Sequence, residues 1–66
     1  MKPVITLELW HDRTWDEWQA RVFVDGKLDA KKTYHAMDRE DARSTRDCMF
    51  WEFDRKGHEV RYKEEL

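Results

Sequence analysis

The residues that decide the fold are 38–57, which read DREDARSTRDCMFWEFDRKG. A helix advances about 100° per residue, so Ala42, Met49 and Phe53 fall within about 20° of one line along it. This spacing predicts one amphipathic helix over residues 38–56, with an apolar face that packs on the rest of the chain.

Both ends of this helix carry recognisable signals. Asp38 is the expected N-cap, and Glu40 and Asp41 add negative charge to the first turn, where the helix dipole favours it. Gly57 follows the last turn, where glycine commonly ends a helix. The sequence therefore predicts the boundaries of the helix as well as its apolar face.

Alternating apolar and polar residues predict strands on both sides of the helix. Three segments precede it and one follows it, over about residues 4–11, 15–24, 27–37 and 58–63. In the first segment Ile5, Leu7 and Leu9 share one face. In the second, the shared apolar face carries Trp18, Ala20, Val22 and Val24. The predicted order is βββαβ, an α+β fold in which a small antiparallel sheet carries the helix on one face and leaves the other face in water.

The third of these segments is the least regular. Asp25 and Gly26 favour a tight hairpin turn before it. Its expected apolar residues are Leu28, Ala30, Tyr34 and Ala36. Lys32 breaks this alternation, which predicts a bulge or a partly unpaired strand.

Composition limits the setting of the chain. Sixty-six residues predict a single small domain over residues 1–66, and four Trp residues favour a packed fold although 42% of the residues are charged. One cysteine excludes an internal disulfide, and no segment resembles a signal peptide or a membrane span, so we expect a reduced, cytoplasmic protein. The start at Met1 and the charged termini predict a complete gene product.

The pattern of reactive residues does not favour an enzyme. Cys48 lies in the middle of the helix, where we expect a small half-buried hydrophobic residue, not an activated thiolate. The three histidines are widely spaced and no Cys-x-x-Cys pair occurs, so no metal or other cofactor is expected. The two glycines are isolated and form no phosphate-binding loop.

The open face of the predicted sheet combines aromatic and basic side chains. These are Trp10, Phe23, Arg21, Lys31, Thr33 and His35. Aromatic residues interleaved with cations on a sheet are typical of proteins that bind single-stranded nucleic acid. The same residues equally fit a contact with a protein partner, or cross-strand pairs that only stabilise an exposed face.

The outer face of the helix is a second candidate surface. It is predicted to carry Glu40, Arg43, Ser44, Asp47, Trp51 and Arg55. Pairing of Arg43 with Glu40 and Asp47 explains the charges of a solvated face, and Arg55 is placed to lie over the ring of Trp51. Trp51, with Phe50 about 100° away, fits an anchor for a partner, unless the C-terminal strand or tail covers it.

Two segments, residues 18–27 and 38–42, contain 15 of the 66 residues. They resemble the DNA-binding domains that place a three-stranded sheet in the major groove, the plant AP2 domains and the integrase arm domains. The resemblance implies DNA contacts by Arg21, Lys27 and Lys31. The added final strand and the net charge of −2 depart from that family pattern.

The function predicted from these features is that of a non-enzymatic binding protein. We expect it to regulate or inhibit a larger intracellular complex by steric block, as do the small inhibitors that phages and mobile elements direct at bacterial defence systems. Its carboxylates would then imitate phosphates toward a basic partner. Two alternatives stay open: a nucleic-acid-binding domain that uses the open sheet face, and a homodimer with Trp51 at its two-fold axis. No membrane contact is expected.

Overall fold

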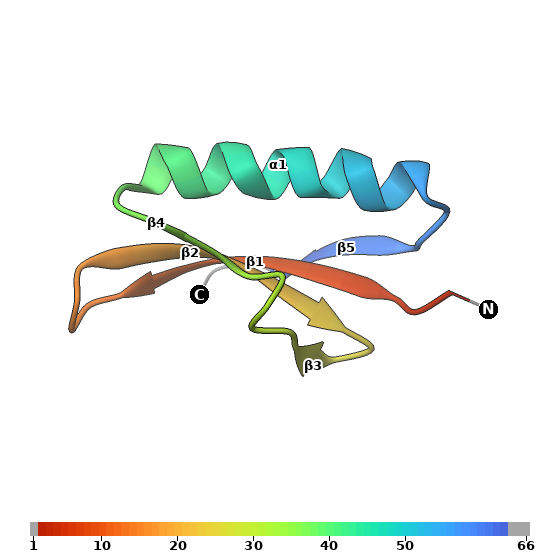
Figure 1. The fold of residues 1–66 in the computed structure, drawn as a ribbon, viewed down its shortest axis with the longest axis horizontal. Coiled ribbons are helices and arrows are strands. Elements are labelled where there is room, and N and C mark those ends of the chain that lie inside the picture. Colours follow the sequence, from red (N-terminus) through yellow and green to blue (C-terminus); the bar gives the residue numbers. More distant parts are fainter. Residues whose placement is uncertain (1, 64–66) are drawn as a thin grey trace.

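The computed structural model describes residues 2–63 and shows one helix lying along one face of a five-stranded sheet (Figure 1). The elements in chain order are β1 (Ile5–Asp12), β2 (Glu17–Val24), β3 (Lys27–Leu28), β4 (Tyr34–Ala36), α1 (Arg39–Arg55) and β5 (Val60–Lys63). The predicted α+β fold with strands before the helix is confirmed.

The central hairpin of β1 and β2 provides most of the core. The two strands pair antiparallel over their full length, from Ile5 opposite Val24 to Asp12 opposite Glu17. The helix-facing residues are the ones that are buried, as the alternation predicted: Ile5, Leu7, Leu9, Ala20 and Val22. The opposite face of the hairpin is left without a covering layer, as Figure 1 shows.

The last strand corrects one prediction, because β5 pairs with β1 in parallel and the sheet is mixed. The path of the chain explains this direction. β4 is antiparallel to β2, and β2 is antiparallel to β1, so β4 runs parallel to β1. A helix of 17 residues is about 26 Å long, which returns the chain along the sheet so that β5 repeats the direction of β4. The antiparallel prediction considered neighbouring segments only.

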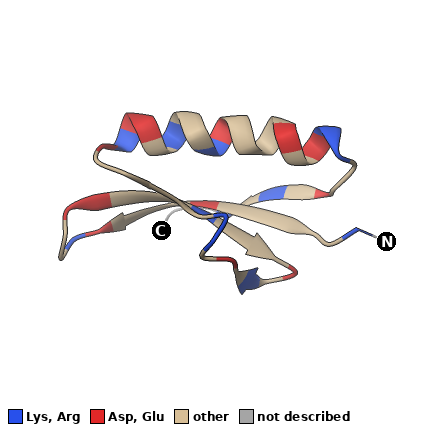
Figure 2. Ribbon diagram, in the orientation of Figure 1, with Lys and Arg blue, Asp and Glu red and all other residues tan. Residues whose placement is uncertain are grey.

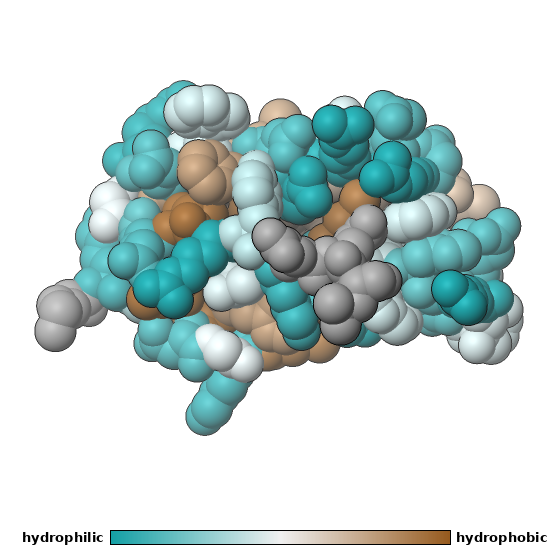
Figure 3. Space-filling view, turned by 180° about the vertical axis from the view of Figure 1, so that it is seen from behind, coloured by the Kyte–Doolittle hydropathy of each residue, from teal (hydrophilic) through white to brown (hydrophobic). Residues whose placement is uncertain are grey.

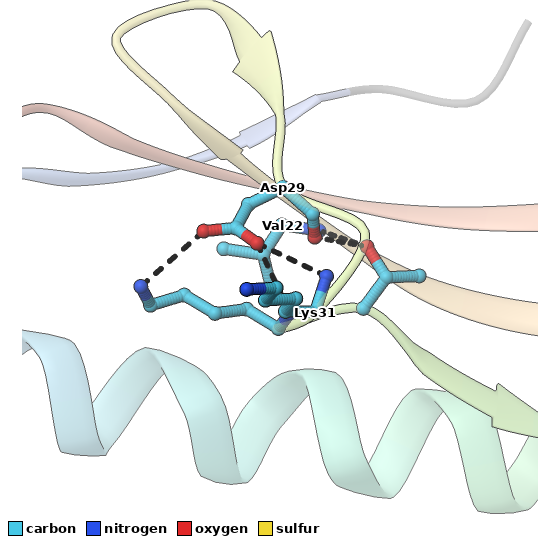
Figure 4. A network of polar contacts seen from close by, with 5 residues as sticks. Val22, Asp29 and Lys31 are labelled. Atoms are coloured by element: carbon cyan, nitrogen blue, oxygen red, sulfur yellow. Dashed lines mark hydrogen bonds and ion pairs between the residues drawn. The ribbon is translucent and has the colours of Figure 1, made fainter.

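The third predicted strand is two short strands separated by a turn at residues 29–33. β3 and β4 both pair with β2. Between them the side chain of Thr33 takes the place of a backbone hydrogen-bond partner for β2. Its Oγ1 accepts from the N–H of Val22 at 3.3 Å and donates to the carbonyl of Asp29 at 2.9 Å. Figure 4 shows this network. The turn shifts the alternation, so Leu28 lies opposite Phe23 on the open face, and only Ala36 of the expected apolar set is buried.

The helix begins and ends where the sequence predicted. The carboxylate of Asp38 accepts from the N–H of Asp41 at 2.9 Å, and Gly57 has a φ of 89° after the last turn. Ala42 is fully buried against the sheet. A hydrogen bond of 2.8 Å from the hydroxyl of Tyr34 to the carboxylate of Asp41 joins β4 to the first turn of α1. This bond and the charge of the carboxylate raise the pKa of Tyr34.

Candidate docking surfaces

The open face of the sheet holds a continuous chain of contacts, which we call the open-face ladder. The guanidinium of Arg21 lies 3.7 Å from the ring centroid of Trp10. Glu8 pairs with Arg21 at 3.7 Å and with Lys63 at 3.4 Å. Lys63 in turn lies 5.3 Å from the ring centroid of Phe23. The ladder therefore runs from one aromatic ring to the other through two cations and one shared carboxylate.

This ladder changes how the open face is interpreted. The structure brings Trp10, Arg21 and Phe23 onto one face, as the sequence indicated. Each ring, however, already has a cation over it, and both cations share the Glu8 carboxylate, whose side chain is only 13% exposed. Stacking of a base on either ring would have to displace an intramolecular cation–π contact. The arrangement favours a stabilising role for these residues within the chain.

Three other residues expected on the open face lie outside the ladder: Lys31, Thr33 and His35. Lys31 is exposed in the turn between β3 and β4, where its backbone N–H donates to Asp29 at 3.0 Å, so the prediction that it stands in a strand is wrong. The reason is the Thr33 bridge, which takes residues 29–33 out of the sheet. His35 lies in β4 opposite Gln19, and its Nδ1 contacts the carboxylate of Glu17.

A second surface combines three aromatic rings from α1 and β5, and we call it the aromatic ridge: Phe50, Trp51 and Tyr62. The centroid of Phe50 lies 5.7 Å from that of Trp51, at an edge-to-face angle of 85°, and 5.2 Å from that of Tyr62. Phe50 is half-buried and packs on the core, whereas Trp51 is 64% exposed and Tyr62 is 45% exposed. Figure 3, a view from behind, shows hydrophobic patches between the helix and the sheet on an otherwise mostly hydrophilic face.

Polar contacts hold the ridge in place. The hydroxyl of Tyr62 donates to Asp47 at 3.1 Å, and the guanidinium of Arg46 lies 4.6 Å from the Tyr62 ring centroid and 3.4 Å from the same carboxylate. Burial and the bond with Asp47 raise the pKa of the Tyr62 phenol. Asp47 thus turns toward β5, and the prediction that it pairs with Arg43 on the outer face of α1 is wrong. Sequence reasoning missed Tyr62 because nothing local links β5 to the helix.

The cations of the outer helix face stand apart from Trp51. Arg43 and Arg55 are exposed, and no cation–π contact to Trp51 occurs within residues 2–63, so the prediction that Arg55 lies over this ring is wrong. β5 contacts Phe50 through Tyr62 and leaves Trp51 exposed. The predicted tail beyond β5, residues 64–66, lies outside the described residues.

A third surface lies at the end of the molecule where β1 turns into β2 and β4 leads into α1 (Figure 1). Trp15 is 79% exposed there and Met37 is 88% exposed. The sequence prediction placed Trp15 at the start of the second strand, but β2 begins at Glu17. The carboxylate of Asp12 accepts from the N–H groups of Thr14 and Trp15 and so forms the turn. Aspartates around Trp15 were the available signal, because they favour turns.

The remaining features of the described residues concern metal ligands, the cysteine and membrane spans. Across residues 2–63 no group of three or more His, Cys, Asp and Glu side chains is placed to hold a metal ion. Cys48 is exposed, not half-buried as expected, since it lies beside the apolar face of α1. Over the same residues no helix is long and apolar enough to cross a membrane.

No protein-family model, curated protein or solved structure matches the chain.

Proposed function

We propose that this chain is a non-enzymatic binding protein that inhibits or regulates a larger complex by covering a surface of one of its proteins. The observation that carries the proposal is the aromatic ridge, in which Trp51 is 64% exposed beside Phe50 and Tyr62. Trp and Tyr are enriched among the residues that dominate binding energy in protein interfaces. The contacts of Tyr62 fix the ridge before a partner arrives, which lowers the ordering cost of binding.

The surroundings of the ridge support a protein partner over a nucleic acid. Exposed residues of both signs surround Trp51 along α1, with Arg43 and Arg55 balanced by Glu52 and Asp54. An apolar centre with a mixed polar rim is the usual anatomy of a protein interface. The four charges just named on α1 sum to zero, whereas a nucleic-acid surface needs a net positive field.

Quantitative capture from the cells that produce the chain tests the proposal. Wild type, Trp51→Ala and Leu28→Ala are immobilised in equal amounts, and the proteins retained are compared by mass spectrometry. Leu28 is the matched control because it is an exposed apolar side chain on β3, separated from β5 by two strands. The partner is expected to bind wild type and Leu28→Ala alike. It should bind Trp51→Ala about 30-fold more weakly, the size of a hot-spot loss of about 2 kcal/mol.

Two further measurements make the outcome decisive. Activity of the purified partner should fall in proportion to its occupancy by the chain. Trp51→Ala should unfold in urea within about 0.5 kcal/mol of wild type, because the removed ring is mostly exposed. A partner that binds Trp51→Ala as tightly as wild type refutes the proposal. A shift from dimer to monomer in sedimentation of Trp51→Ala, with no other protein captured, replaces it with self-association.

A further inference from the structure

Two large hydrophobic side chains at one end of the molecule are mostly exposed in the described part of the chain. We define the hairpin end as residues 11–17 and 37–41, which are the β1–β2 turn with its flanking residues and the β4–α1 connection with the first helical turn. Trp15 and Met37 in this region are more exposed than any other large hydrophobic residue described. The register supports the proximity of the two segments, since Trp18 pairs with both His11 and Ala36. The hairpin end therefore presents an apolar surface separate from the aromatic ridge.

Charge is distributed unevenly between this end and the rest of the chain. Residues 2–63 contain 13 Lys and Arg residues and 13 Asp and Glu residues, because two of the 15 acidic residues are Glu64 and Glu65. The hairpin end contains six of the acidic residues and two of the basic residues, a formal charge of −4 with His neutral, so the other described residues carry +4. The six are Asp12, Asp16, Glu17, Asp38, Glu40 and Asp41. Figure 2 shows the charged residues on the ribbon.

These carboxylates differ from four of the seven other acidic residues described in their partners. Those four each pair with a Lys or Arg side chain: Glu8, Asp29, Asp47 and Glu59. In the described chain none of the six carboxylates at the hairpin end does so. Five of the six, all but Glu40, accept from backbone N–H groups or a tyrosine hydroxyl, or contact histidine. Their charge is therefore not compensated by ion pairs with Lys or Arg among the described residues.

We propose that the hairpin end is a second docking surface, which binds a basic amphipathic segment of a partner protein. Apolar side chains of that segment cover Trp15 and Met37, and its lysines and arginines meet the surrounding carboxylates. The indole of Trp15 also offers its face to a cation, since no cation–π contact to it is found among the described residues. The same field repels nucleic acids and anionic membranes. Together with the ridge, this surface gives the chain two separate contact points.

Two synthetic peptides of equal length serve as probes of this surface. One has Lys and Leu at amphipathic helical spacing, and the other has Glu in place of each Lys. Titrations are followed by NMR at the indole N–H of Trp15, the methyl group of Met37 and the indole N–H of Trp51. The Lys–Leu peptide is expected to shift the first two signals and leave Trp51 in place, and its affinity should fall as salt is raised. The Glu–Leu peptide is expected to shift none of them.

Three variants separate this surface from the ridge. The double variant Trp15→Ala, Met37→Ala is expected to bind the Lys–Leu peptide at least tenfold more weakly. Arg13→Glu changes the charge of the end from −4 to −6 at an exposed turn position and is expected to tighten binding about threefold. Trp51→Ala is the matched control and is expected to bind like wild type. Each substituted side chain is exposed, so the variants should fold.

Four results overturn the proposal. The first is equal affinity of the double variant and wild type. The second is equal binding of both peptides, which would show that charge has no part. The third is a shift at Trp51 instead of Trp15, which would place the peptide on the ridge. The fourth is a shift of Trp15 and Met37 by a single-stranded oligonucleotide or by anionic vesicles. Failure here leaves the proposed function intact, because that proposal depends on the aromatic ridge and not on Trp15 or Met37.

Discussion

Replacement of Glu8 by Gln tests whether the open-face ladder stabilises the fold. Glu8 is a carboxylate shared by Arg21 and Lys63, whose cations lie over the rings of Trp10 and Phe23. Glutamine keeps the size of the side chain and removes its charge. Both cations then lose their ionic partner while they remain held near the sheet.

The size of the effect follows from distance and exposure. Unit charges about 4 Å apart attract by about 4 kcal/mol at an effective dielectric constant of about 20, but desolvation and side-chain ordering cancel most of this. Fully exposed pairs retain about 0.2–1 kcal/mol. Glu8 is 13% exposed and has two partners, so we expect Glu8→Gln to lower the free energy of unfolding by about 1–2 kcal/mol. A chain of 66 residues has about 3–10 kcal/mol in total.

Urea unfolding followed by tryptophan fluorescence measures this loss, which corresponds to about 1 M or more in the midpoint at an m-value of about 1 kcal/mol/M. Glu59→Gln is the matched control, because the same substitution there removes an ion pair with Arg61 in which both side chains are more than half exposed. The control should cost less than about 0.5 kcal/mol. If Glu8→Gln is as stable as wild type, or if both substitutions cost the same, the ladder does not contribute as argued.

Three other predictions follow from the fold. Thr33→Val keeps the shape of the side chain but removes the acceptor of the Val22 N–H, while the carbonyl of Asp29 keeps its bonds from the N–H groups of Lys32 and Thr33. The change should cost about 1–3 kcal/mol in urea unfolding, and a neutral result would discount the bridge. The pKa values of Tyr34 and Tyr62 are raised in the folded state, so the folded chain holds these protons more tightly. The contribution of the two tyrosines to stability should be constant below about pH 9 and be lost above about pH 10, so the alkaline loss of stability should be smaller in the double Phe variant. Gly57→Ala should cost about 1 kcal/mol in thermal unfolding, because its φ of 89° strains any side chain.

Local patterns were enough to predict much of the fold. The spacing of Ala42, Met49 and Phe53 gave the helix, and Asp38 and Gly57 gave its ends, because these signals act within one helix. The alternation in the first two strands predicted which face is buried, since each residue step in a strand reverses the face. Exposure of Trp51 followed from the same geometry.

What the sequence did not predict depends on contacts between distant segments. The parallel pairing of β5 results from the whole path through β2, β4 and α1, and no residue of β5 encodes it alone. The Thr33 bridge needs β2 beside the turn before its hydroxyl has two partners. Tyr62 joined the candidate site only because that pairing brings it to Phe50 and Asp47. Tertiary contacts of this kind decide the structural role of a residue, although its local sequence pattern stays the same.

The four tryptophans divide into two groups, and this division links stability to binding. Trp10 has Arg21 over its ring, and Trp18 stacks on His11 at a centroid distance of 4.3 Å, so both serve the fold. Trp15 and Trp51 are 79% and 64% exposed. A tryptophan can bury about 150–250 Å², so each of these two leaves at least about 2 kcal/mol of hydrophobic stabilisation unrealised in a chain of marginal stability. A partner that covers either ring supplies that burial to the folded state alone, and its binding must therefore raise the unfolding temperature of the chain.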